Sequence, residues 1–162
     1  MPFAEFWTWL EGLPLSEHIG FTWWFPLLES IHVLAIALLV GSILMVDLRL
    51  LGVAAIKYPA NRVTRELIPW TWGALCVAAV TGTGMFMTRA ATYVENPAFQ
   101  TKLVLLLLAG GNMALFQFRT FRDVEIWNTA VVTPVAARVA GAASLLLWAG
   151  VVLAGRWTGH IN

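Results

Sequence analysis

The chain has 162 residues, of which 59% are hydrophobic and 12% are charged. Soluble domains carry about 25% charged residues, so this composition cannot cover a water-facing surface and indicates an integral membrane protein. The formal net charge of +1 excludes the concentrated basic face that duplex binding needs, and we therefore expect no nucleic acid partner.

The N-terminal segment, residues 1–20, contains no basic side chain. It therefore lacks the positively charged start of a secretory signal peptide, and we expect it to stay on the mature protein. Its apolar residues recur at helical spacing until Gly12 and Pro14 end the pattern, which predicts a short helix lying in the membrane interface. Trp23 and Trp24 then mark the membrane boundary.

Four apolar stretches follow, each long enough to cross a bilayer, for which about 20 residues are needed. Three of them start at or next to a proline, a residue favoured in the first helical turn. The chain is thus predicted to be an all-α, integral membrane four-helix bundle that forms a single domain over residues 1–162. The expected spans are residues 26–51, 67–89, 97–121 and 134–157.

Small residues recur every four positions in the second and fourth spans. Where helices meet in lipid, small residues let their backbones approach closely. We therefore expect packing seams along these two rows. The first row is Ala74, Ala78 and Gly82, and the second is Ala136, Ala140 and Ser144.

Basic residues are concentrated around the loops after the first and third spans, which hold seven of the ten. The positive-inside rule makes these loops cytoplasmic. Both termini are therefore expected on the periplasmic side of a bacterial inner membrane. The seven residues are Arg49, Lys57, Arg62, Arg65, Arg119, Arg122 and Arg138.

Three ionisable residues are expected inside the spans near the periplasmic boundary: Glu29, His32 and Lys102. Such groups are costly in lipid unless they face protein or water, so each is a candidate site residue. Glu29 and His32 are three residues apart, which puts them on adjacent positions of one helix face. Each also has a structural interpretation: Glu29 complements the helix dipole, Lys102 extends to the headgroups, and His32 bonds to a neighbouring helix.

The leading functional hypothesis is binding of haem b or a porphyrin in membrane redox chemistry. One imidazole suffices for five-coordinate iron, so His32 is the candidate metal ligand. Lys102 would pair with a propionate and Glu29 would orient the imidazole, while His32 and Lys102 are the candidate catalytic residues if the protein is an enzyme. A di-iron site is not expected, because the chain has a single Glu-x-x-His pair.

Two other functions compete with this hypothesis. A non-enzymatic membrane anchor or assembly subunit would use the polar residues for helix packing alone. A small transporter or proton-conducting protein would use the face from Glu29 to Asp47, which lie five complete turns apart, as a water path. The expected partners are the lipid bilayer and either a second copy of the chain or a membrane redox partner.

Several motifs resemble an uncharacterised, domain-of-unknown-function family of small bacterial four-helix membrane proteins. They are Glu29-Ser30-Ile31-His32, Asp47-Leu48-Arg49-Leu50-Leu51-Gly52, Asn96-Pro97-Ala98-Phe99 with Lys102, and Gly155-Arg156-Trp157. More distantly, the layout is similar to the membrane-embedded protoporphyrinogen IX oxidase of the HemJ type. That resemblance implies a functional histidine in the first span and a functional lysine in the third, which His32 and Lys102 match, together with an association with haem. The chain departs from it in its flanking motifs and in lacking a second histidine within the spans.

Overall fold

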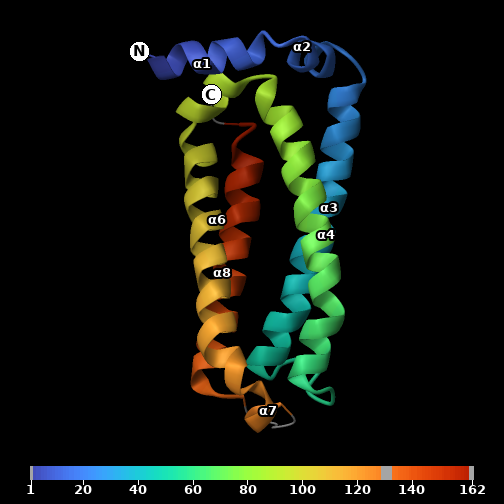
Figure 1. The fold of residues 1–162 in the computed structure, drawn as a ribbon, viewed down its shortest axis with the longest axis vertical. Coiled ribbons are helices and arrows are strands. Elements are labelled where there is room, and N and C mark those ends of the chain that lie inside the picture. Colours follow the sequence, from blue (N-terminus) through green and yellow to red (C-terminus); the bar gives the residue numbers. More distant parts are fainter. Residues whose placement is uncertain (1, 129–132, 161–162) are drawn as a thin grey trace.

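The computed structural model describes residues 2–128 and 133–160, and every regular element among them is helical (Figure 1). Four helices are long and apolar enough to cross a membrane, which confirms the predicted fold class. They are α3 (Trp24–Leu51), α4 (Ala60–Met87), α6 (Pro97–Leu115) and α8 (Val135–Trp157). The shorter elements are α1 (Pro2–Glu11), α2 (Pro14–Phe21), α5 (Ala90–Glu95), the π-helical η1 (Phe116–Thr120), η2 (Phe121–Asp123) and α7 (Val124–Trp127).

The four long helices form two antiparallel hairpins. α3 packs along α4, α6 packs along α8, and the hairpins meet where α3 packs against α8. α4 and α6 contact each other much less. Both ends of the chain lie at one end of the bundle, which we call the terminal end; the connections from α3 to α4 and from α6 to α8 lie at the other, the loop end (Figure 1).

The two N-terminal helices lie across the terminal end (Figure 1). The helix is interrupted between α1 and α2, because Pro14, in the first turn of α2, has no N–H that could continue the hydrogen bonds of α1. The sequence predicted one short helix here, and α2 is an addition. Trp7 of α1 packs edge-on against Phe86 of α4, with ring centroids 5.8 Å apart, and the Glu11 carboxylate accepts a hydrogen bond from the Ala91 N–H at 2.8 Å.

Close helix packing occurs at small residues, as expected. Ala74 and Ala78 of α4 are buried. On α8, however, the buried positions are Ala137, Gly141 and Val151, while Ala136 is exposed, so the seam is rotated from the start of the predicted row. Ser144 of that row bonds to Asp47 of α3. A Cβ at Gly141 would lie 3.2 Å from a backbone oxygen of α3, which shows how closely α3 and α8 approach.

Asn96 determines where α6 begins. Its side-chain oxygen accepts hydrogen bonds from the N–H groups of Ala98 and Phe99, at 2.9 and 3.1 Å, and so caps the helix. Its side-chain nitrogen donates to the Thr158 carbonyl at 3.1 Å. The start of α6 is therefore tied to the end of α8, and this positions Lys102, which lies in the second turn of α6.

Candidate functional site

His32 is half-buried between α3 and α4, in the half of the bundle nearest the terminal end. Its Nδ1 atom lies 2.9 Å from the Thr81 hydroxyl oxygen. That hydroxyl lies 2.7 Å from the Val77 carbonyl and 3.3 Å from the Ala78 carbonyl, and it can donate its one hydrogen to either of them. When it does so, its oxygen accepts from Nδ1–H of His32, and the lone pair of the neutral imidazole is on Nε2. The Ala78 backbone is a further hydrogen-bond partner of the ring.

Gly82 makes room for the imidazole ring. A Cβ atom at this position would lie 3.0 Å from Cε1 and 3.5 Å from Nδ1 of His32. The ring thus packs directly against the backbone of α4, where any side chain would push it away. Thr81 and Gly82 together set the position and orientation of the imidazole.

Lys102 of α6 is half-buried and lies against α8. Its Cδ atom would be 3.5 Å from a Cβ at Gly155, and its Nζ atom lies 4.9 Å from the centre of the Phe99 ring. Lys102 forms no ion pair with any residue that the structure describes. Its positive charge interacts electrostatically with His32. The site therefore combines an imidazole held by Thr81 with a cation that has no carboxylate partner among the described residues.

Aromatic side chains close the terminal end next to Lys102. Phe86 at the end of α4 stacks on Phe99 at the start of α6, with centroids 5.4 Å apart. Tyr93 of α5 stacks on Phe86 at 6.2 Å, and Trp7 contacts the same ring edge-on. This aromatic cluster joins α4 to α6 and forms an apolar wall beside the ammonium group.

Glu29 occupies a different position from the other two predicted site residues. It is exposed and forms no hydrogen bond or ion pair with the residues that the structure describes. The side chain that bonds to Nδ1 of His32 is that of Thr81, not that of Glu29. Thr81 and Gly82 contact His32, and Phe99 contacts Lys102. The sequence motifs did not indicate these three residues as site residues.

Two further ionisable residues are buried at the loop end. Asp47 is 4% exposed, bonds to the Ser144 hydroxyl, and has one carboxylate oxygen, Oδ2, without a partner. Arg49 is 1% exposed and donates to the carbonyls of Tyr58 and Asn128, at 2.8 and 3.3 Å. Because Tyr58 and Asn128 belong to the two loops at this end, Arg49 holds those loops together.

A small polytopic membrane protein is the class that this architecture defines, because four helices are long and apolar enough to cross a bilayer. Within that class, the chain belongs to a family of unknown function, DUF6644, which matches residues 7–161. No curated protein and no solved structure matches the chain.

Proposed function

We propose that this protein binds haem b or a porphyrin through His32 and Lys102 and takes part in membrane redox chemistry. The observation that carries the proposal is the hydrogen bond between Nδ1 of His32 and the Thr81 hydroxyl. Histidines that hold a metal commonly donate their other ring N–H to a fixed partner, which orients the ring and leaves the second nitrogen to bind. Haem, when bound, would supply an iron that gains or loses one electron.

The donor set fits a tetrapyrrole better than a bare metal ion. Among the residues that the structure describes, no three His, Cys, Asp or Glu side chains converge to hold a metal. A tetrapyrrole brings four nitrogen donors of its own, so one imidazole is sufficient. Lys102, which has no carboxylate partner in that same part of the chain, suits a propionate. The aromatic cluster gives the apolar surroundings that such a ring needs.

The distant resemblance to the HemJ-type oxidase supports the same assignment of His32 and Lys102. We also propose that the terminal end faces the periplasm of a bacterial inner membrane. The support is the charge distribution, since basic residues are concentrated around the loops at the loop end.

The test is a spectroscopic titration of the purified full-length protein with haemin and with protoporphyrin IX. We expect a shifted Soret band with saturable binding, and loss of that band in His32→Ala. The matched control is His160→Ala, because His160 is an exposed histidine beyond α8. A Soret band that is unchanged in His32→Ala, or the absence of any saturable binding, would refute the proposal.

Proton conduction is the second candidate, and one observation favours it. Ser42 and Thr71 share a hydrogen bond of 2.9 Å, between the His32–Thr81 pair and the Asp47–Ser144 pair and nearer to the latter. The fifteen residues from His32 to Asp47 correspond to about 22 Å of helix. Dye-monitored proton flux into proteoliposomes tests this candidate: flux that Asp47→Asn abolishes supports it, and wild-type flux equal to that of empty vesicles excludes it.

A further inference from the structure

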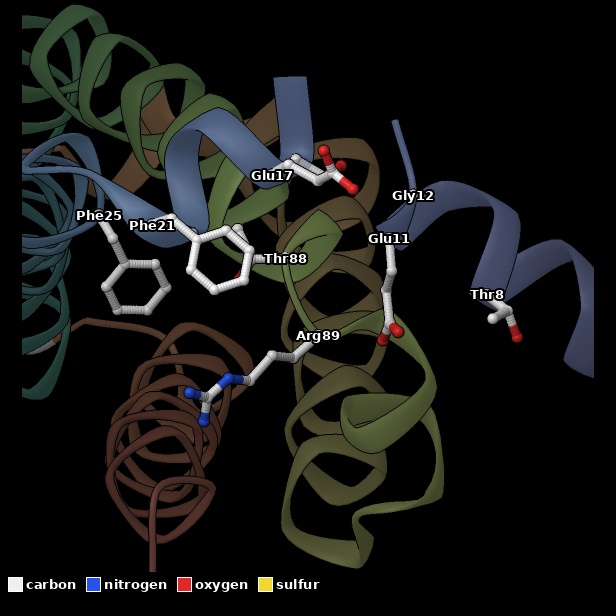
Figure 2. A pocket seen from close by; sticks show the side chains of 10 residues that line it. Thr8, Glu11, Gly12, Glu17, Phe21, Phe25, Thr88 and Arg89 are labelled. Carbon is white, nitrogen blue, oxygen red and sulfur yellow. The ribbon is translucent and has the colours of Figure 1, made fainter. Parts of the chain in front are cut away.

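A cleft of about 540 Å³ opens at the terminal end, where α1 and α2 meet the junction of α4 and α5 (Figure 2). His32 and Lys102 do not line it, so the cleft is separate from the site described above. Its lining includes three charged residues, Glu11, Glu17 and Arg89, and two aromatic ones, Phe21 and Phe25. The arrangement of these five side chains indicates what the cleft binds.

The charges of the cleft are of both signs and are kept apart. Glu11 is held at one wall, because one of its oxygens accepts the Ala91 N–H. Glu17 and Arg89 are exposed, and neither side chain forms a hydrogen bond or ion pair within residues 2–128 and 133–160. Figure 2 shows the Arg89 side chain extending away from Glu11 and Glu17. The cleft thus offers one cationic and two anionic groups to a ligand.

The aromatic side of the cleft lies where α2 ends and α3 begins. Phe21, which is 89% exposed, and Phe25 both line it (Figure 2). Trp23 and Trp24, which follow directly in the chain, stack with their centroids 4.6 Å apart and are exposed at the start of α3. Tryptophan in this position is typical of the membrane interface.

We infer that this cleft binds the headgroup of an aminophospholipid, phosphatidylethanolamine. Its phosphate pairs with Arg89, its primary ammonium donates to Glu17 and to the open oxygen of Glu11, and an acyl chain runs along Phe21 and Phe25. The proposal does not depend on porphyrin binding.

The charge set selects among headgroups. Phosphatidylglycerol carries a net negative charge without an ammonium group, so Glu11 and Glu17 repel it. Phosphatidylcholine carries a quaternary ammonium, which has no N–H to donate to a carboxylate. A zwitterion with a primary ammonium is therefore the headgroup that satisfies all three charged residues.

Binding of single lipids to the delipidated full-length protein in detergent, followed by native mass spectrometry, tests the inference. We expect phosphatidylethanolamine to bind about tenfold more tightly than phosphatidylglycerol or phosphatidylcholine with the same acyl chains. Arg89→Gln should weaken its binding about tenfold, and Glu17→Gln should reduce the preference for it over phosphatidylglycerol. Arg156→Gln is the matched control, because Arg156 is exposed near the same end and does not line the cleft.

Three results would overturn the inference. The first is phosphatidylglycerol binding as tightly as phosphatidylethanolamine. The second is Arg89→Gln behaving like Arg156→Gln. The third is soluble phosphoethanolamine binding as tightly as the intact lipid, since this would mean that the acyl chain contributes nothing and that the ligand is a free phosphate ester.

Discussion

The Nδ1 atom of His32 and the hydroxyl oxygen of Thr81 lie 2.9 Å apart and join α3 to α4. When the Thr81 hydroxyl donates to the Val77 carbonyl, this contact places the hydrogen of the neutral imidazole on Nδ1. A residue on one helix thus influences the chemistry of a residue on its neighbour.

Thr81→Val should weaken haemin binding by about tenfold, because it removes the acceptor for Nδ1–H and lets the imidazole change tautomer and rotate. Thr81→Ser restores the hydroxyl and should recover most of the affinity. Thr71→Val is the control, since Thr71 is a hydroxyl of the same helix that bonds to Ser42 instead. Titration of all three variants by Soret absorbance checks this; equal weakening by Thr71→Val would contradict it.

Gly82→Ala should displace the imidazole, because a Cβ there would lie 3.0 Å from its Cε1 atom. Overpacking of this kind costs about 1–3 kcal/mol of unfolding free energy, and haemin affinity should fall as well. Gly73→Ala on the same helix is the matched control, with no atom within 4 Å of the added methyl group. It should stabilise the helix by up to about 1 kcal/mol. Thermal unfolding in detergent measures both changes. Similar shifts of the midpoint in Gly82→Ala and Gly73→Ala would argue against close packing of His32 on Gly82.

Lys102→Met should weaken haemin binding by about tenfold, because it removes the partner of a propionate while keeping an apolar stem against Gly155. Lys102→Arg should recover part of the loss. Protoporphyrin IX dimethyl ester separates charge from packing, since its carboxylates are capped. The dimethyl ester should bind wild type and Lys102→Met with the same affinity. Weaker binding of the ester to Lys102→Met would assign Lys102 a packing role only.

Arg49→Met should destabilise the protein by about 3 kcal/mol, because it removes charged hydrogen bonds from a buried group. Those bonds hold the Tyr58 and Asn128 carbonyls. Arg62→Met is the comparison, since Arg62 forms an exposed pair with Glu66, and its unfolding temperature should match wild type. Unfolding followed by circular dichroism in detergent tests this, and equal midpoints for the two variants would refute a clamp at Arg49.

Alkaline phosphatase fusions should be active after residue 160 and inactive at Lys57 and Arg122, because both loops at the loop end carry the basic residues. Green fluorescent protein fusions at the same positions should give the inverse pattern. Active phosphatase at Lys57 would reverse the proposed orientation.

The four long helices could be predicted from the sequence, because apolar runs of sufficient length specify them. Counting residues from the helix starts also predicts a similar depth for His32 and Lys102. α4 begins about two turns before the expected apolar stretch, at Ala60, because Pro59 and not hydropathy sets its start. A helix can therefore extend beyond the apolar stretch that is expected to lie in lipid.

Rotation about each helix axis could not be predicted. One residue corresponds to about 100° of rotation, so neighbouring small residues point to different helices. This is why the seam of α8 includes Ala137 rather than Ala136. The same uncertainty concealed Thr81, whose contact with His32 depends on the rotation of two helices and on their relative register.

The two hydrogen-bond acceptors of Arg49 are synthesised at different times, which affects how the bundle assembles. Tyr58, its first acceptor, follows within nine residues, whereas Asn128, its second, is made only after α6. Chains fold from the N-terminus as they emerge, so the first hairpin enters the bilayer with this guanidinium incompletely bonded. The link that Arg49 makes between the two loops is therefore completed only after residue 128 has been synthesised, and the first hairpin alone lacks it.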